Sequence, residues 1–415
     1  ELLEPSGTLR PHRHKVFIFN WYDPPCFAKL TGQIDSKEKI PMPKEPAVNP
    51  AHDLIMPHHF YLETETTNLK AGRHYITFLT EAHGRKFMVR ESFSLTAAPK
   101  VPVIYCTDLF HPHDDPDDHF DLATLFSIPE VDLKAIILDN TAKQKRKPGK
   151  LAVEQLCSIT GRKPRVATGL SSPLTSPKDP GTKQPKEDQE GVNLILDTLS
   201  STSEPVIIIT VGSLRDVAAA YNRNPLLCHR KIERLYAFIG NARASGTSSF
   251  REYNVSLDPN AFRRIMTSGL PVYWVPCFDG GPFKNNGFAS YWRARHKDLL
   301  SDVTDPVRQY FIFALTKKNG IDHLAFLQSP VDPKEWDILL KGRRNLWCCA
   351  VFTDAVGRKI VRNGKTWKSL PRDWPGEDLC PFTFEHIFVN VDSTGEVFYP
   401  SHLPYYPVNR FKITN

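Results

Sequence analysis

Short apolar runs alternate with amphipathic segments of helical length between residues 100 and 280. The apolar runs are rich in Val and Ile and cover residues 101–105, 133–138, 206–211, 235–239 and 272–278. Continuous apolar runs of this length are typical of strands that are buried on both faces of a parallel sheet. Helical patterns separate them, at residues 119–126, 151–159, 214–221 and 259–267. This order predicts an α/β fold with a doubly wound, mostly parallel sheet and right-handed crossovers.

The first quarter of the chain has no convincing helical pattern. Residues 68–95 contain two runs with period-2 alternation around an Ala-His-Gly turn, and residues 15–22 form an earlier run of the same kind. Such runs indicate a hairpin in a sheet with one buried face. We therefore expect a small all-β, immunoglobulin-like sandwich over residues 1–99. A Pro-containing linker follows, and the α/β domain is predicted to cover residues 100–415.

Two later segments depart from the α/β pattern. Residues 168–191 are rich in Ser, Pro, Lys, Gly and Asp, which predicts a mobile loop of the kind that can act as a lid. Residues 382–398 show two β-like runs around the turn sequence DSTG, which predicts a hairpin near the end of the chain.

Composition narrows the function classes. The chain has 415 residues, 40% of them hydrophobic and 24% charged, as in an ordinary globular protein of two or three folded units. No apolar run approaches the roughly 18 residues that span a bilayer. The net charge of +7 is mild, and the densest basic run, KQKRK at residues 143–147, indicates a solvated loop rather than a nucleic-acid site.

The cysteines and the first residue bear on the cellular compartment. The eight cysteines include no Cys-x-x-Cys pair, so neither a disulfide scaffold nor a zinc finger is expected. The chain begins at Glu1 rather than Met, which fits a secreted or periplasmic protein that has lost its leader and fits a trimmed chain equally well. Oligomeric state is not encoded in any motif, and a homo-oligomer is compatible with the sequence.

The strongest chemical signal follows the first strand of the α/β domain. Residues 106–121 read CTDLFHPHDDPDDHFD and hold six aspartates in one strand-to-helix segment. Like charges at this density repel one another, and a bound cation would offset the repulsion. Asp117 and Asp118 could also cap the following helix, which would offset a smaller part of the repulsion. The alternative to a cation site is a solvated acidic loop with an ordinary helix cap.

The position of these aspartates favours a ligand site, because ligands of doubly wound sheets bind beyond the carboxyl ends of the strands. Hard oxygen donors favour Ca²⁺ or Mg²⁺. His111, His113 and His119 lie in the same segment, so a transition metal with imidazole ligands is the alternative.

Four motifs, in order, resemble the inosine–uridine nucleoside hydrolases. The aspartate segment resembles that family's Asp-x-Asp-x-x-x-Asp-Asp motif, and residues 128–140, which end in Asp-Asn, are similar to its second strand ending in Gly-Asn. Residues 210–218, TVGSLRDVA, resemble its Thr-Gly-Pro-Leu-Thr-Asn turn. Most specific is REYNVSLDPNA at residues 251–261, which resembles Ala-Glu-Phe-Asn-x-x-x-Asp-Pro-Glu-Ala. The resemblance covers residues 101–278 well.

The resemblance implies a calcium-dependent hydrolase of N-glycosidic bonds that acts on a nucleoside or a related ribosyl compound. It implies that Asp108 is the general base and a calcium ligand, with Asp118 and the carbonyl oxygen of Thr210 as further ligands. It also implies roles in substrate binding, with the ribose hydroxyls held by Asp117, Asn140 and Asn254 and the 5′ side held by Glu252.

Several positions depart from the family pattern. Cys106 replaces the first Asp of the motif, and about five extra residues lengthen the loop before Asp118, so that Asp114 or Asp115 could substitute for a family aspartate. The family's C-terminal His-Asp pair, which supplies an acid for the leaving group and a calcium ligand, falls at Leu346-Trp347. Glu385-His386 is an alternative source of both groups, although an exposed pair on a strand is the preferred interpretation.

These departures keep more than one function open. The first is an N-glycoside hydrolase with an altered leaving-group pocket. The second is a catalytically weak nucleoside- or sugar-binding protein on the same scaffold, and the third is another metal-dependent glycoside hydrolase. The sequence does not separate purine, pyrimidine and other leaving groups, and it assigns no role to residues 1–99.

Overall fold

The computed structural model describes residues 100–141, 146–242, 251–363, 366–371, 381–399 and 404–414, together with seven strands before residue 100. The chain divides into two compact units, Glu1–Pro99 and Lys100–Asn415. No helix in the described ranges is long and apolar enough to cross a membrane.

The first unit contains only strands among its described residues. They are β1 (Thr8–Leu9), β2 (Arg13–Phe19), β3 (Lys29–Ile34), β4 (Glu38–Pro41), β5 (His59–Glu65), β6 (Gly72–Ala82) and β7 (Arg85–Leu95). One sheet has the order β1-β7-β6-β3-β4, and β2 pairs with β5. Strands β6 and β7 pair from Gly72↔Leu95 to Ala82↔Arg85, which is the hairpin that the alternating pattern predicts. The immunoglobulin-like assignment of residues 1–99 stays a prediction.

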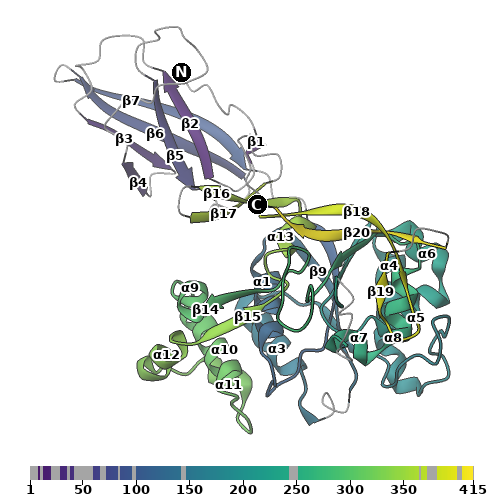
Figure 1. Cartoon of the computed structure of the whole chain (residues 1–415). Helices are drawn as coiled ribbons and strands as arrows, with labels where there is room; N and C mark the ends of the chain where they lie inside the picture. Colours follow the sequence, from purple (N-terminus) through teal and green to yellow (C-terminus); the bar gives the residue numbers. More distant parts are fainter. Residues whose placement is uncertain are drawn as a thin grey trace. The chain divides into compact units, whose positions relative to one another are not determined.

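The second unit is built on a nine-stranded sheet of order β10-β9-β8-β11-β12-β13-β20-β18-β19 (Figure 1). Its strands are β8 (Val101–Thr107), β9 (Val131–Leu138), β10 (Arg165–Thr168), β11 (Val206–Thr210), β12 (Ile232–Phe238), β13 (Val272–Val275), β18 (Phe382–Val391), β19 (Val397–Phe398) and β20 (Tyr406–Ile413). In the order of the sheet, the strands β10, β9, β8, β11, β12, β13 and β20 are parallel to their neighbours. Strand β18 runs antiparallel to β20, and β19 runs antiparallel to β18. The mostly parallel sheet predicted from the sequence is confirmed.

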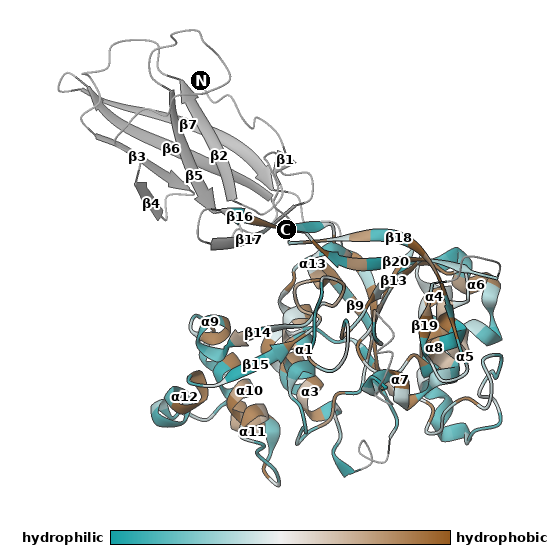
Figure 2. Ribbon diagram, in the orientation of Figure 1, coloured by the Kyte–Doolittle hydropathy of each residue, from teal (hydrophilic) through white to brown (hydrophobic). Residues whose placement is uncertain are grey.

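Helices cover the sheet and form a group beside it (Figure 1). They are α1 (Asp117–Ser127), α3 (Lys150–Thr160), α4 (Glu190–Ser201), α5 (Arg215–Arg223), α6 (Pro225–Lys231), α7 (Tyr253–Leu257), α8 (Pro259–Met266), α9 (His296–Leu300), α10 (Asp305–Leu315), α11 (His323–Leu327), α12 (Pro333–Leu340) and α13 (Phe352–Ala355). Two further strand pairs belong to the described part of the unit: β14 (Trp292–Arg295) pairs with β15 (Arg343–Leu346), and β16 (Arg358–Asn363) pairs with β17 (Thr366–Pro371). Both apolar and polar residues occur along these helices (Figure 2).

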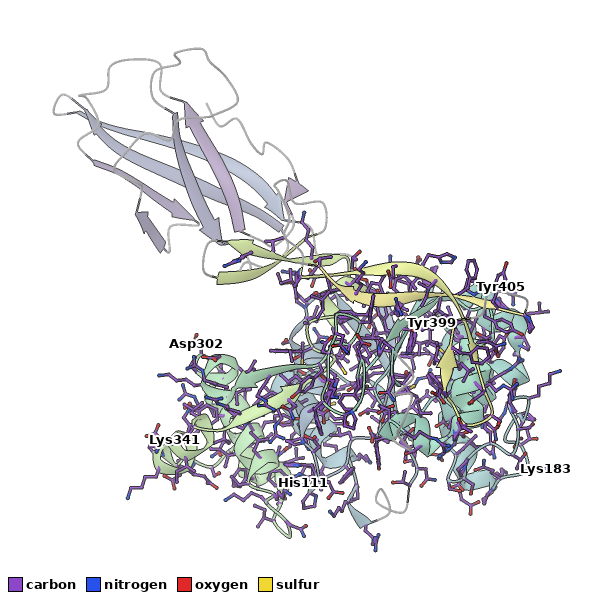
Figure 3. The ribbon with its side chains drawn as sticks, in the orientation of Figure 1. His111, Lys183, Asp302, Lys341, Tyr399 and Tyr405 are labelled. Carbon is purple, nitrogen blue, oxygen red and sulfur yellow. The ribbon has the colours of Figure 1, made fainter. Side chains whose placement is uncertain are left out.

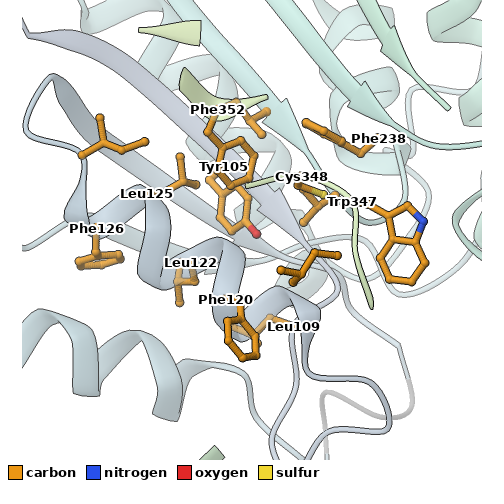
Figure 4. Close-up of a cluster of buried hydrophobic side chains, with 14 of the residues drawn as sticks. Tyr105, Leu109, Phe120, Leu122, Leu125, Phe126, Phe238, Trp347, Cys348 and Phe352 are labelled. Atoms are coloured by element: carbon orange, nitrogen blue, oxygen red, sulfur yellow. The ribbon is translucent and has the colours of Figure 1, made fainter. Parts of the chain in front are cut away.

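Both faces of the central strands are buried. Along β8, Val103 and Tyr105 belong to one hydrophobic cluster, while Ile104 and Cys106 belong to another on the opposite face. The first cluster includes residues of α1, α3 and α10, and the second includes residues of α4, α5 and α8. Figure 4 shows part of the first cluster around Tyr105. Burial on both faces explains why these strands read as continuous apolar runs rather than alternating ones.

The order of the strands contains a switch point next to β8. From β8 the chain passes to β9 and β10 on one side, and then to β11, β12 and β13 on the other. Loops that leave adjacent strands in opposite directions open a crevice at the carboxyl ends of these strands. Asp108 directly follows β8, and Val211 directly follows β11. The aspartate segment therefore lies at the place where this fold binds ligands.

Candidate active site

The turn after β8 and the first turn of α1 hold three aspartates together. Asp117 and Asp118 are the first two residues of α1, where the helix dipole favours negative charge. The Thr107 hydroxyl donates to Asp118 Oδ1 at 3.0 Å and accepts from the Leu109 backbone N–H at 3.0 Å. Thr107 thus fixes the turn that carries Asp108 relative to the start of α1.

These aspartates line a cavity of about 300 Å³ that also reaches the end of β12, the start of α7 and the loops after β11, β13 and β15. Its wall has two main kinds of side chain. The carboxylates are Asp108, Asp114, Asp115, Asp117, Asp118 and Glu252, and the aromatic residues are Phe110, Phe238, Tyr253, Phe278, Phe283 and Trp347. Val211, Asn254, Cys277 and Cys348 complete the described lining, which includes no Lys, Arg or His.

The acid groups raise one another's pKa. Burial, followed by the charge of Asp139, raises the pKa of Asp108 to about 7, while a hydrogen bond with Asp118 lowers it. Burial and then neighbouring aspartates raise the pKa of Asp117 and Asp118 well above the ordinary value. The cavity therefore holds more negative charge than its protein surroundings stabilise, and a proton or a cation would relieve it.

The carboxylate oxygens of the cavity are the kind of ligand that a hard divalent cation such as Ca²⁺ prefers. Across the described ranges, no three His, Cys, Asp or Glu side chains converge as metal ligands. Ca²⁺ accepts carboxylate, main-chain carbonyl and water oxygens in one shell, so the carboxylates of the cavity could share an ion with such partners. The side chains of Asp108 and Asp118 lie close enough to interact, so this pair could share one ion.

Glu252 and Asn254 reach the cavity from α7, but much of their hydrogen-bonding capacity is used within the protein. Glu252 caps α7: Oε1 accepts from Asn254 N at 2.9 Å, and Oε2 accepts from Gly240 N at 2.9 Å and Val255 N at 3.1 Å. The Asn254 amide donates to the carbonyl oxygens of Val211 and Phe238, at 2.9 and 3.1 Å. Asn254 thus links the ends of β11 and β12, and its own carbonyl oxygen is the part left for a ligand.

Two residues expected at the site are not in the described cavity wall. Asn140 is buried and donates to Asp188 Oδ1 at 2.9 Å, while Ser171 donates to Asp188 Oδ2 at 2.5 Å. Asn140 therefore contacts the segment between β10 and α4. Thr210 is fully buried inside β11, and its neighbour Val211 lines the cavity instead. The roles that the resemblance implies for Asn140 and for the carbonyl oxygen of Thr210 stay predictions.

The extra residues of the aspartate loop contribute directly to the cavity. Asp114 pairs with Lys147 at 3.4 Å, and Asp115 pairs with Arg344 of β15 at 3.1 Å. Both aspartates are more than half exposed and line the cavity. The insertion therefore adds two anchored carboxylates to the rim without replacing Asp108 or Asp118.

The segment after β15, which begins at Trp347, reaches the cavity. The Trp347 indole N–H donates to the Cys277 carbonyl oxygen at 3.0 Å, and Trp347, Cys277 and Cys348 all line the cavity. Figure 4 shows Cys348 beside Tyr105. Burial raises the pKa of both thiols well above the ordinary value. This wall therefore presents an indole and two protonated thiols.

Other candidate groups lie outside the cavity wall. His111, His113 and His119 are buried, with ring centroids 5.6–5.8 Å apart for His111–His119 and His113–His119, and none lines the cavity. Glu385 lies on β18, where it accepts from Arg410 Nε at 2.9 Å. Glu385 and His386, like the three histidines, are not among the described lining residues of the cavity.

Sequence reasoning missed Asp139, which ends the second strand where the resembled family has Gly. Its carboxylate accepts from Ser213 N at 2.7 Å and from the Ser213 hydroxyl at 2.9 Å. A Cβ on Gly212 would lie 2.7 Å from Asp108 N and 2.8 Å from Asp139 Oδ2. The missing side chain of Gly212 therefore lets the turn after β11 approach Asp108. The signal available in the sequence was a carboxylate at the end of a predicted strand.

The fold and the cavity together define an α/β protein with an acidic ligand crevice at the switch point of a parallel sheet. The family model described as inosine-uridine preferring nucleoside hydrolase matches residues 107–316, which is half of the chain. The chain belongs to this family.

Several known proteins are similar to this chain. A pyrimidine-specific ribonucleoside hydrolase RihA of Citrobacter koseri is 28% identical over 191 residues, and the match covers 41% of this chain and 58% of the relative. A RihA of Escherichia coli is 26% identical over 188 residues, with the same coverage. The chain thus spans 58% of the length of these curated relatives. A plant nucleoside hydrolase, PpNRh1, is 17% identical, has a TM-score of 0.44, and covers 76% of this chain and 95% of its own.

Proposed function

We propose that this protein hydrolyses the N-glycosidic bond of nucleosides or related ribosyl compounds with the help of a divalent cation, preferably Ca²⁺. The observation that carries the proposal is the shared cavity of Asp108, Asp117 and Asp118, which has no cationic side chain in its described wall. Family membership supports the same reaction class.

Asp108 is the proposed general base. It stands at the end of β8, at the carboxyl edge of the sheet, and its pKa of about 7 suits proton transfer near neutral pH. It would take a proton from the water that attacks C1′ of the sugar. The nearby carboxylates Asp117 and Asp118 would stabilise the positive charge that develops on the sugar ring as the base departs.

A bound Ca²⁺, held by Asp108 and Asp118, would acidify the attacking water and fix the sugar diol. Asp117 and the Asn254 carbonyl oxygen would accept hydrogen bonds from ribose hydroxyls at the cavity wall. The Glu252 carboxylate would contribute mainly by holding α7 in place, because three backbone N–H groups occupy its oxygens. Asn140 would act through the loop that it contacts.

A catalytically weak nucleoside-binding protein is the second candidate. It is favoured by the cavity wall at Trp347 and Cys348, where no imidazole is available to protonate a leaving base. The two candidates predict the same binding and differ only in turnover.

The test is release of ribose from a panel of purine and pyrimidine nucleosides and N-ribosylpyridinium, measured with a reducing-sugar assay in Ca²⁺ and in chelator. We expect turnover in Ca²⁺ and its loss in chelator. The proposal fails if a folded, Ca²⁺-binding protein releases no ribose from any substrate of the panel.

Two variants locate the activity. Asp108→Asn should lower kcat by at least about a thousandfold, because a general base contributes 10²–10⁴ and this residue is also a proposed ligand. Asp302→Asn is the matched control, since Asp302 is exposed and lies outside the cavity (Figure 3). Full activity in Asp108→Asn would exclude this base.

A further inference from the structure

The proposed reaction leaves one proton unassigned. When a neutral base departs, the electrons of the broken C–N bond make it an anion unless an acid protonates it. The described cavity wall has no His, Lys or Arg, and its thiols, Cys277 and Cys348, are deeply buried. The three clustered aspartates are already assigned in the proposed reaction to the water, the cation and the sugar. A leaving group that already carries a positive charge needs no such acid.

The cavity also has the surfaces that bind an aromatic cation. Six aromatic side chains line it, among them Phe278, Phe283 and Trp347, whose ring centroids lie 5.4 Å (Phe278–Phe283) and 6.1 Å (Phe278–Trp347) apart. A cation over such rings is attracted by the negative faces of the π systems. Carboxylates stand on the same wall, so charge and stacking act on one ligand.

Phe283 has an unusual backbone. It is 58% exposed at the cavity, and its φ is 55°, in the left-handed region that bulky residues rarely adopt. Asp279, fully buried, accepts from the backbone N–H groups of Asn286 and Phe288, each at 3.2 Å, and so helps to hold the loop around it. A strained aromatic that is held open to a cavity is typical of a residue that contacts a ligand.

The inserted aspartates place negative charge on the rim. Arg344 and Lys147 hold Asp115 and Asp114 in place, and each aspartate is more than half exposed on its side chain. The partner cations do not line the cavity, whereas the aspartates do. The rim therefore presents carboxylates to a ligand and keeps the basic groups behind them.

We infer that the preferred substrate of the proposed hydrolase is an N-glycoside whose aromatic base is a cation, such as a pyridinium or an N-alkylated purine. The inference rests on the proposed function and narrows its substrate class. In the reaction, the water oxygen bonds to C1′, the C–N bond breaks, and its electron pair neutralises the ring nitrogen. Asp108 takes the proton of the water, so the base leaves neutral without an acid.

Binding is tested with two ribosides in which a C–C bond joins the aromatic ring to the sugar, so that neither can be hydrolysed. One carries an N-methylpyridinium ring and the other a methylphenyl ring of the same shape. We expect the cation to bind about tenfold tighter or more, and this ratio to fall severalfold in Asp115→Asn. Asp115→Glu, which keeps the charge, should restore the ratio, and Asp302→Asn should leave it unchanged.

Turnover is tested with N-ribosylpyridinium, uridine and inosine, each rate divided by its uncatalysed rate. Faster catalysis of the pyridinium supports the inference. Equal or better catalysis of uridine or inosine, or equal binding of the two carbon-linked ribosides, overturns it and leaves the proposed function standing. Failure to release ribose from all three substrates overturns the proposed function itself.

Discussion

Replacing Glu252 with Ala should destabilise the protein strongly. The carboxylate is 4% exposed and accepts three backbone N–H bonds, from Gly240, Asn254 and Val255. Each bond to a charged acceptor contributes about 1.5–3 kcal/mol, and an unpaired buried donor costs about 1–3 kcal/mol. Water from the cavity can satisfy some of the three donors in the variant, so we expect a loss of about 3–5 kcal/mol.

The assay is urea unfolding followed by tryptophan fluorescence. Six of the seven tryptophans follow residue 99, so the signal reports mainly on the second unit. Thermal unfolding should show a midpoint roughly 6–12 °C lower than that of the wild type. Glu204→Ala is the matched control, because Glu204 is an exposed turn residue.

Glu252→Gln separates capping from contact with a ligand. The amide keeps one acceptor oxygen, but its NH₂ group faces backbone donors, so we expect an intermediate loss of stability. A variant Glu252→Ala that unfolds within about 1 kcal/mol of the Glu204→Ala control would refute the reasoning. A large rise in KM without loss of stability would instead assign Glu252 to the substrate.

Two other predictions concern buried groups around the site. Burial raises the folded-state pKa of Asp121 to about 7, above its unfolded value, so this group's contribution to stability is present below about pH 4 and is lost as the pH rises to 7. The free energy of unfolding of Asp121→Asn, relative to that of the wild type, should therefore rise by roughly 2–4 kcal/mol as the pH is raised from 4 to 7.5. Urea titrations measure this difference, and a difference that does not change with pH would contradict the reasoning. Gly212→Ala should lower kcat/KM at least about tenfold and lower the free energy of unfolding by about 1–3 kcal/mol, because the new Cβ would lie 2.7 Å from Asp108 N. Normal kinetics of this variant would show that the turn after β11 can move away.

The local pattern of the sequence was sufficient for the elements of the α/β unit. All five apolar runs form strands of the central sheet, and the four helical patterns correspond to α1, α3, α5 and α8. They could be predicted because burial on both faces of the sheet imposes apolar runs, and because caps such as Asp258 before Pro259 mark a helix start. Strand β20 was missed, because YPVNRFKI is polar for a strand inside a parallel sheet and only its neighbours β13 and β18 give it a place.

The chemical class of the site was also present in the sequence, because six aspartates after a first strand are hard to explain without a ligand. The local sequence does not contain the partners that decide what each polar group can do. Glu252 and Asn140 belong to recognisable motifs, yet Glu252 is occupied by the amides of residues 240, 254 and 255, and Asn140 by Asp188, 48 residues away.

The sequence alone thus determined that an acidic crevice lies at the carboxyl edge of a parallel sheet, since both the strands and the aspartates are local features. Only the tertiary structure decided what faces this crevice. It brings Trp347 and Cys348 beside the aspartates and places Asp139 behind Asp108. These contacts join residues far apart in the chain, and they follow from packing of the whole unit rather than from any periodicity or spacing.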